Sequence, residues 1–204
     1  MSGRFIALEG LDGAGTTTAS RGLAAALEQR GVRCIVTFQP SDRSIGTAIR
    51  GHLRSTSARL DPHALALLFA ADRLDHVRSV VEPALAQGTW VVCDRYVMSS
   101  WAYQSTECDL QWVRMINGRA PWPDLTCVLT IGAEQAAARI AARAQQQSTP
   151  TDIFDALAVQ RRVAACYAGF LAEALSNVVA IDATHEPDAV VAEIVARCDA
   201  AKLL

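Results

Sequence analysis

The chain has 204 residues and a mass of 21.8 kDa, a size that favours a single domain over residues 1–204. Hydrophobic residues make up 51% and charged residues 20% of the chain, which excludes the polar composition of disordered proteins. The formal net charge is −2 and the sequence pI is about 6.1. Such a balance excludes broad electrostatic attraction to nucleic acids or anionic lipids, so any bound anion needs a local site.

The six cysteines form no CxxC pair, which argues against a zinc site and favours reduced thiols. The sequence has neither a leader pattern nor an apolar run near the roughly 18 residues of a membrane span. We therefore expect a soluble cytoplasmic protein. Among its 19 basic residues, Lys202 is the only lysine.

Short apolar runs alternate with segments of helical periodicity, a pattern typical of a parallel sheet covered by helices on both faces. Asp61 and Pro62 supply the N-cap and first position of a long helix that ends near Gln87, before Gly88. The other elements predicted in this half are strands at 4–9 and 33–38, a helix at 17–29 and a loop at 39–44.

The second half continues the alternation and completes five strands of one doubly wound α/β domain. Residues 145–151 are polar and without periodicity, which predicts a loop, and we expect a lid at about 144–153. The remaining predicted elements are strands at 89–93, 125–131 and 177–181, and helices at 133–144, at 154–174 and after Pro187.

A glycine-rich segment between the first strand and the first helix predicts a phosphate site, because glycines let backbone N–H groups curl around an anion at a helix start. Gly10, Gly15 and Thr17 satisfy the Walker A spacing, but Thr16 stands where that motif has lysine. A glycine-rich turn without function is the alternative. The residues expected to bind the phosphates of a nucleotide are Gly10, Asp12, Gly13, Ala14, Gly15, Thr16, Thr17 and Thr18.

Further motifs extend along the chain. They are Phe5-Ile6 through Gly15, Leu67 through Arg73, Asp94-Arg95-Tyr96, Ser99 through Gln104, and Pro123 through Thr126. With these motifs the sequence resembles the thymidylate kinases over nearly its whole length. The resemblance implies a homodimer with the P-loop nucleoside monophosphate kinase fold, a five-stranded parallel sheet with helices on both faces. It also implies transfer of the γ-phosphoryl of ATP to dTMP, with Mg²⁺, to give dTDP.

The resemblance assigns a role to each matching acceptor residue. Phe69 would stack on thymine, Arg73 would bind the base or hold its surroundings, Arg95 would grip the phosphate of dTMP, Tyr103 would pack against the deoxyribose, Asp12 would meet its 3′-hydroxyl and Ser100 would contact the base. An arginine fork suits phosphate and an aromatic face suits a pyrimidine.

Simpler roles remain open for some of these side chains. Phe69 fits a core position, Arg73 fits a surface ion pair with Asp72 or Asp75, and we interpret Tyr96 as core packing. For catalysis, the resemblance implies that Asp94 orients the acceptor or a metal-bound water and that the Thr17 hydroxyl ligates Mg²⁺.

The departures from the family pattern remove charge. Thr16 replaces lysine, Phe38-Gln39-Pro40-Ser41 replaces Arg-Glu-Pro-Gly, Asp152-Ile153-Phe154-Asp155 replaces Asp-Arg-Phe-Glu, and Thr130 replaces aspartate. A single preorganised donor is worth roughly 10² to 10³ in rate, so these losses matter. Arg139 and Arg143, four residues apart on one helix face, are candidates to compensate at ATP, with Arg143 as a catalytic residue; a solvated helix face is the alternative. Arg43 is a candidate to replace the arginine lost at Phe38.

The retained acceptor residues and the lost charges together leave three possible functions. The first is a divergent but working thymidylate kinase, because the acceptor residues from Phe69 to Tyr103 are retained. The second is a non-catalytic protein that binds a nucleotide. The third is a kinase that phosphorylates another phosphorylated or hydroxylated acceptor.

Overall fold

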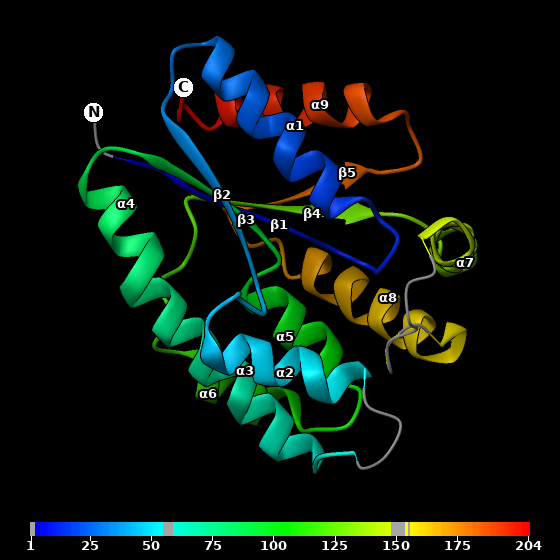
Figure 1. The fold of residues 1–204 in the computed structure, drawn as a ribbon. Coiled ribbons are helices and arrows are strands. Elements are labelled where there is room, and N and C mark those ends of the chain that lie inside the picture. Colours follow the sequence, from blue (N-terminus) through cyan, green and yellow to red (C-terminus); the bar gives the residue numbers. More distant parts are fainter. Residues whose placement is uncertain (1–2, 55–58, 148–153, 155) are drawn as a thin grey trace.

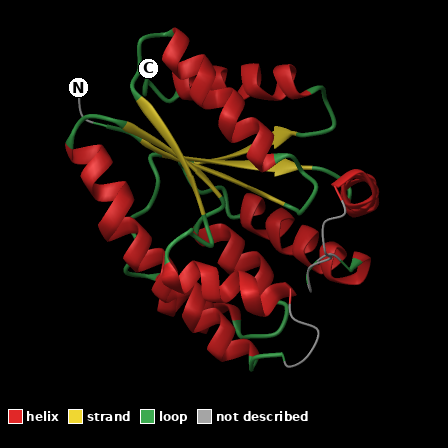
Figure 2. Ribbon diagram, in the orientation of Figure 1, coloured by secondary structure: helices red, strands yellow, loops and turns green. Residues whose placement is uncertain are grey.

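The computed structural model describes residues 3–54, 59–147, 154 and 156–204. Its centre is a sheet of five parallel strands in the order β2-β3-β1-β4-β5 (Figures 1 and 2). The strands are β1 (Phe5–Gly10), β2 (Cys34–Phe38), β3 (Trp90–Asp94), β4 (Leu125–Thr130) and β5 (Val178–Asp182). The predicted α/β class, strand number and parallel sheet are confirmed, with strand ends shifted by at most one residue.

Strand β1 occupies the middle of the sheet, between β3 and β4. Leu8 is in register with Asp94 on one side and with Cys127 on the other. All six residues of β1 are buried, because helices cover both faces of the sheet and leave no polar side for alternation. Parallel register places the carboxyl ends of these strands at one edge, where ligands bind in open α/β sheets.

Helices cover both faces of the sheet (Figure 1). Helices α1 (Thr16–Gln29) and α9 (Pro187–Ala200) pack on each other and on one face, and α5 (Val97–Gln104) and α8 (Leu157–Ala172) pack on the other. Leu23 and Leu27 are fully buried on α1, which anchors the helix that starts at the glycine-rich loop. None of the helices in the described part of the chain has the length and apolar content to cross a bilayer.

The long helix predicted from Asp61 is present, but it contains a change of helix type. It runs as α3 (Pro62–His76), a π-helical turn η1 (Val77–Val81) and α4 (Glu82–Ala86). The Asp61 side chain accepts from the N–H groups of His63 and Ala64, as an N-cap does. The π turn directly follows α3, the helix that carries the predicted base-binding residues Phe69 and Arg73.

Three helices were not predicted, namely α2 (Ser44–Arg54), α5 and α6 (Leu110–Asn117). Two of them have eight residues, too few for a clear periodic signal. Helix α7 runs from Ala133 to Gln147, so the loop predicted to begin at residue 145 was placed too early. Glutamine is a good helix former and lets the helix continue. The rest of the predicted lid, residues 148–153, lies outside the described residues.

Candidate active site

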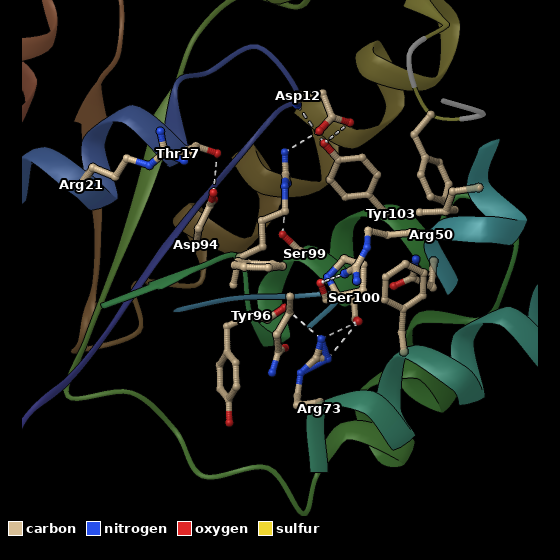
Figure 3. A pocket seen from close by; sticks show the side chains of 18 of the residues that line it. Asp12, Thr17, Arg21, Arg50, Arg73, Asp94, Tyr96, Ser99, Ser100 and Tyr103 are labelled. Carbon is tan, nitrogen blue, oxygen red and sulfur yellow. Dashed lines mark hydrogen bonds and ion pairs between the residues drawn. The ribbon is translucent and has the colours of Figure 1, made fainter. Parts of the chain in front are cut away.

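A cavity of about 510 Å³ opens at the carboxyl ends of β1, β2 and β3 (Figure 3). The first turns of α1, the faces of α2, α3 and α5, the last turn of α7 and Phe154 complete its wall. The structure brings nine predicted site residues into this wall, namely Asp12, Thr17, Phe69, Arg73, Asp94, Arg95, Ser100, Tyr103 and Arg143. They come from distant parts of the sequence, so the fold assembles the predicted acceptor side in one place.

The glycine-rich loop forms the corner between β1 and α1. Gly10, Gly13 and Gly15 have positive φ angles of 153°, 82° and 93°, which glycine adopts without steric cost. A Cβ on Gly13 would lie 2.4 Å from the carbonyl oxygen of Ala136, so the loop packs directly on α7. No side chain caps α1 at Gly15, which leaves its first N–H groups to bind an anion.

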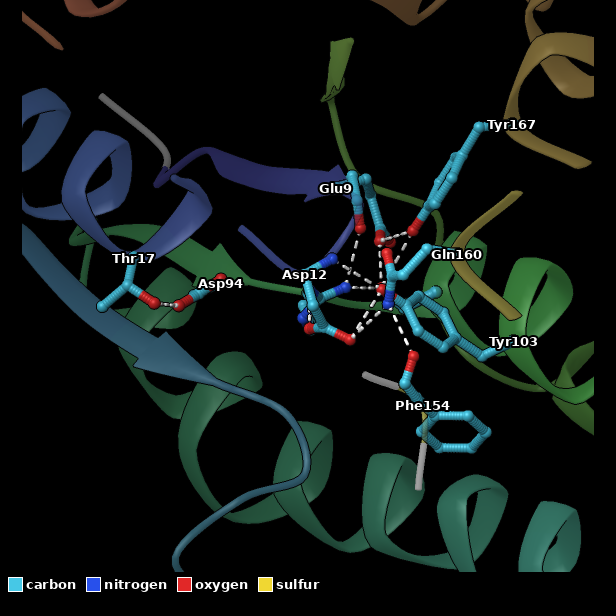
Figure 4. Close-up of polar contacts among 11 residues, drawn as sticks. Glu9, Asp12, Thr17, Asp94, Tyr103, Phe154, Gln160 and Tyr167 are labelled. Atoms are coloured by element: carbon cyan, nitrogen blue, oxygen red, sulfur yellow. Dashed lines mark hydrogen bonds and ion pairs between the residues drawn. The ribbon is translucent and has the colours of Figure 1, made fainter. Parts of the chain in front are cut away.

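Thr17 and Asp94 face each other where α1 begins and β3 ends (Figure 4). The Thr17 hydroxyl donates to Oδ2 of Asp94. Oδ1 of Asp94 is buried and has no partner among the described residues, although a buried polar atom ordinarily has one. Hydroxyl and carboxylate oxygens are the hard ligands that Mg²⁺ prefers, so this pair would suit a magnesium ion.

Arg95 is held rigidly at the end of β3. Its backbone is left-handed, with φ 70°, a conformation that is uncommon for a residue other than glycine. Nη1 donates to the Gly10 carbonyl at 2.8 Å and to Ser99 Oγ at 3.2 Å, and Nη2 donates to Asp12 at 2.6 Å. Burial opposes the charge, but the nearby Asp12 carboxylate helps to outweigh it, and the pKa of Arg95 lies well above its ordinary value.

Asp12 joins several elements at the cavity floor. Its carboxylate accepts from Arg95, from the Tyr103 hydroxyl at 3.1 Å and from Gln160 Nε2 at 3.2 Å. The Tyr103 hydroxyl also accepts from the Asp12 backbone N–H at 2.9 Å, and burial raises the pKa of Tyr103, which stays neutral. Gln160 further donates to the Phe154 carbonyl at 2.8 Å, so this cluster also fixes the chain just after the predicted lid (Figure 4).

Glu9 supports the same corner from inside the sheet. Its buried carboxylate accepts from Ser99 at 2.5 Å, from Tyr167 at 3.2 Å and from the Tyr96 N–H at 3.0 Å. Burial raises the pKa of Glu9, while the hydrogen bond from Ser99 and the charge of Arg95 oppose the rise. Glu9 thereby holds both the backbone next to Arg95 and the Ser99 hydroxyl that Arg95 contacts.

Arg73 is buried and makes no surface ion pair, so that alternative was wrong. Its two terminal nitrogens donate to Ser100 Oγ at 3.0 and 2.9 Å, to Asn117 at 2.9 Å and to the Tyr96 carbonyl at 3.1 Å. Only its Nε–H lacks a partner among the described residues. Burial lowers the pKa of Arg73, while Tyr96 and Glu9 oppose the change. Asp72 instead binds Ser41.

The two aromatic predictions have different outcomes. Phe69 is partly buried and packs against the main core, yet it also lines the cavity, so both roles proposed for it are compatible with its position. Tyr96 is 1% exposed, stacks edge-on against Phe5 and donates its hydroxyl to the Pro121 carbonyl. Its interpretation as core packing fits this burial, but Tyr96 also lines the cavity, from which the sequence analysis had left it out.

The positions that have lost charge, and the arginines proposed to replace it, differ in whether they line the cavity. Thr16 is buried and does not line the cavity. Phe38 is 44% exposed at the cavity wall, beneath Arg50. Arg43 binds Asp75 at 2.5 Å and is not part of the wall, so it does not replace the arginine lost at Phe38. Arg143 reaches the cavity, whereas Arg139 does not line it.

Several wall or supporting residues were not singled out from the sequence. They are Arg21, Arg50, Asn117, Gln160 and Tyr167; Ser99 and Gln104 belong to a motif noted above but were given no role. Arg21 carried a signal, because it lies four residues after Thr17 on one helix and therefore shares its face. The partners of Asn117 and Gln160 are far away in sequence, so no local pattern indicates them.

Comparison with known proteins agrees with this geometry. The family model described as "Thymidylate kinase" matches residues 8–194. The chain belongs to the thymidylate kinase family. It is 38% identical over 202 residues to a probable thymidylate kinase of Pyrococcus abyssi, covering 96% of both chains. It is also 38% identical over 197 residues to a thymidylate kinase of Rhodopseudomonas palustris, covering 93% of this chain and 86% of the other.

A third relative, a thymidylate kinase of Bordetella petrii, is 43% identical over 148 residues, covering 68% of this chain and 69% of the other. The resemblance inferred from the motifs is therefore confirmed. In this chain the corner of β1, α1 and β3 carries the uncharged Thr16 at the position where the Walker A motif has lysine.

Proposed function

We propose that the protein transfers the γ-phosphoryl group of ATP to dTMP and releases dTDP and ADP. The observation that supports this most strongly is the position of Arg95 beside the glycine-rich loop, next to Thr17 and Asp94. Phosphoryl transfer needs positioning and charge neutralisation more than covalent chemistry. A cation that holds the acceptor phosphate beside a P-loop satisfies that need.

Arg95 is proposed to bind the phosphate of dTMP. Three hydrogen bonds from its terminal nitrogens go to protein acceptors, and an arginine has five N–H donors. Two donors thus remain for phosphate oxygens. Because the protein already fixes the guanidinium, little side-chain entropy is lost when the substrate binds.

Ser100 is proposed to select the base. Both lone pairs of its oxygen accept from Arg73, so the hydroxyl can only donate. A donor-only group pairs with the 4-oxygen of thymine and meets the 4-amino group of cytosine donor to donor. Phe69 in the same wall offers an aromatic face for stacking. A 4-oxopyrimidine is therefore the preferred base.

Tyr103 and Asp12 are proposed to bind the sugar. The Tyr103 ring lies edge-on to Phe154, with centroids 5.2 Å apart, and its hydroxyl is tied to Asp12. This rigid wall disfavours an added 2′-hydroxyl. The Asp12 carboxylate accepts three protein hydrogen bonds and has about four acceptor sites, which leaves room for the 3′-hydroxyl.

The donor side is proposed to consist of the P-loop amides, Thr17, Asp94 and Arg143. Thr17 and Asp94 would hold Mg²⁺, consistent with the unpartnered buried oxygen of Asp94. When bound, Mg²⁺ supplies positive charge to the terminal phosphates. Asp94 also accepts a hydrogen bond from the Thr17 hydroxyl, and this bond fixes the start of α1 against β3. Arg139 is proposed to contact ATP outside the described cavity.

We further propose a cytoplasmic homodimer. Leu67 and Leu74 are 50% and 41% exposed on α3, two turns apart on one helix face, where a second copy would cover them. All six cysteines are free, which fits a reducing compartment.

A coupled assay with ATP, Mg²⁺ and dTMP, run against dCMP, dUMP and a buffer blank, tests this function. We expect turnover with dTMP and weak turnover with dCMP. Calorimetry with dTMP and with ATP accompanies the assay. Binding of dTMP without turnover would support a non-catalytic nucleotide-binding protein instead, and turnover only with another acceptor would support a different kinase.

A further inference from the structure

Five arginines line the cavity, and the protein already uses three of them. Arg73 and Arg95 bind Ser100, Asn117, Asp12 and backbone carbonyls. Arg50 donates to the carbonyls of Pro40 and Ser41. Arg21 and Arg143 have no hydrogen-bond or ion-pair partner in the part of the chain that the structure describes. These two charges are therefore available to a ligand.

Arg21 lies beside the proposed reaction centre. It is one turn after Thr17 on α1 and exposed, although its neighbours Ala19, Ser20 and Leu23 are buried. Figure 3 shows Arg21 next to Thr17, with Asp94 facing Thr17 at the cavity wall. Spacing of four residues places Arg21 and Thr17 on the same helix face. Its guanidinium therefore shares the cavity with both proposed magnesium ligands.

The residue that normally supplies this charge does not do so here. Thr16 is buried at 5% exposure, lies outside the cavity wall and carries no charge. The Ser20 hydroxyl donates to its carbonyl at 2.8 Å, which keeps this first turn compact. Phe38 and Gln39 in the wall carry no charge either, and Arg50 beside Phe38 is already bound to the carbonyls of Pro40 and Ser41. Charge for a terminal phosphate must come from the next turn of α1 or from another element.

We propose that Arg21 binds the phosphoryl group that ATP transfers, in place of the lysine missing at position 16. The inference rests on the proposed kinase function and names the cation of that same site. Arg21 forms hydrogen bonds and an ion pair only, so no bond to it is made or broken. An arginine fork binds two phosphate oxygens at once, and the buried side of α1 fixes the helix that carries it.

The first experiment compares R21Q with R21K and with R78Q in the complete enzyme. Arg78 is a suitable control because its side chain is 86% exposed, away from the cavity wall. We expect R21Q to lower kcat roughly 10²-fold or more, the usual effect of losing one preorganised donor. The KM for dTMP should change less than threefold, R21K should keep at least a tenth of the wild-type kcat, and R78Q should behave as wild type.

The second experiment is rescue by charge at position 16. In the R21Q background, T16K should raise kcat at least tenfold, whereas in the wild type it should raise kcat less than threefold, because Arg21 already supplies the charge. Thermal unfolding of each variant accompanies the kinetics. A wild-type kcat in R21Q, or failure of a folded T16K/R21Q protein to regain activity, would overturn the proposal.

Binding of inorganic tripolyphosphate with Mg²⁺, measured by calorimetry, separates this inference from the proposed function. We expect R21Q to weaken tripolyphosphate binding at least tenfold and R78Q to leave it unchanged. A wild type without turnover would contradict the proposed function, yet this comparison would still decide on Arg21. Equal affinity of wild type and R21Q would contradict the inference even in an active kinase.

Discussion

At the scale of residues, the pairing of Arg73 and Ser100 shows what the sequence could and could not predict. Both residues belong to recognisable motifs, and both lie in the cavity wall. Their mutual hydrogen bonds, and the support from Asn117, join helices α3, α5 and α6. No local pattern indicates such contacts, because they arise only when distant helices pack. Motifs thus indicated residues that the structure brings together in one cavity wall, while the hydrogen-bond directions required the structure.

The substitution S100A tests the donor-only role of Ser100. Without the hydroxyl, the base loses one hydrogen bond and Arg73 loses an acceptor, so kcat/KM for dTMP should fall roughly tenfold or more. The preference for dTMP over dCMP should narrow, because the group that disfavours the amino base is gone. Steady-state kinetics with both nucleotides measures this ratio. The exposed Ser176 provides a control as S176A, and an unchanged ratio in S100A would contradict the assignment.

At the scale of elements, the glycine-rich loop and the end of α3 each couple neighbouring segments. Gly13 packs on Ala136 of α7. His76, the last residue of α3, contacts Thr37 Oγ1 at 2.6 Å and Gln39 Nε2 at 3.0 Å, and so ties the π turn to the end of β2. The long helices were predicted, whereas the shorter α2, α5 and α6 and the π turn were not, although Asp109 caps α6.

The substitution G13A should disturb the loop more than its conformation alone requires. Gly31 has a similar φ, 77° against 82°, but open space around it, so G31A isolates the cost of a left-handed alanine, roughly 1–2 kcal/mol. G13A adds a clash with the Ala136 carbonyl. We expect a larger loss of unfolding free energy and a raised KM for ATP in G13A only. Denaturation measures the unfolding free energy, and steady-state kinetics measures the KM for ATP. Equal changes of both quantities in G13A and G31A would refute this prediction.

Burial of His76 should make the stability of the protein depend on pH. Burial lowers the pKa of His76 below its ordinary 6.5, with Asp72 opposing the change. The neutral ring is thus favoured in the folded state, and below pH 6.5 the unfolded chain takes up a proton that the folded one refuses. The free energy of unfolding therefore falls as pH decreases from about 6.5. Between pH 7.5 and pH 5.0, denaturation should show a smaller decrease in the free energy of unfolding for H76Q than for the wild type. Equal decreases in the two proteins would exclude His76 as the cause.

At the scale of the whole molecule, the alternation of strands and helices was enough to predict the sheet and its covering layers. The carboxyl ends of parallel strands meet at one edge, and this explains why Asp12, Phe38 and Asp94 share a cavity. Which arginines compensate for the lost charges could not be derived, because Arg43, as a replacement for the arginine lost at Phe38, and Arg139 and Arg143, as candidates at ATP, all look available in the sequence. Only the structure shows that Arg43 is paired with Asp75.

The proposed homodimer is tested by charging the exposed face of α3. Two glutamates in L67E/L74E would be buried at an interface without partners, so the dimer should dissociate. Sedimentation velocity should give twice the chain mass for wild type and the single-chain mass of 21.8 kDa for the variant. M115E, at a residue 68% exposed on α6, is the comparison. A wild type that sediments as a monomer would contradict the proposal.

Gln160 connects two parts of the cavity wall that are far apart in the sequence. One side-chain nitrogen of a completely buried residue contacts both the Asp12 carboxylate and the Phe154 carbonyl. A ligand that binds the Asp12 carboxylate therefore changes the free energy of packing Phe154 in its observed position. In turn, a displacement of Phe154 changes the affinity of Asp12 for that ligand. Linkage makes this influence equal in both directions. The Gln160 amide thus links Asp12 in the cavity wall to the backbone at Phe154.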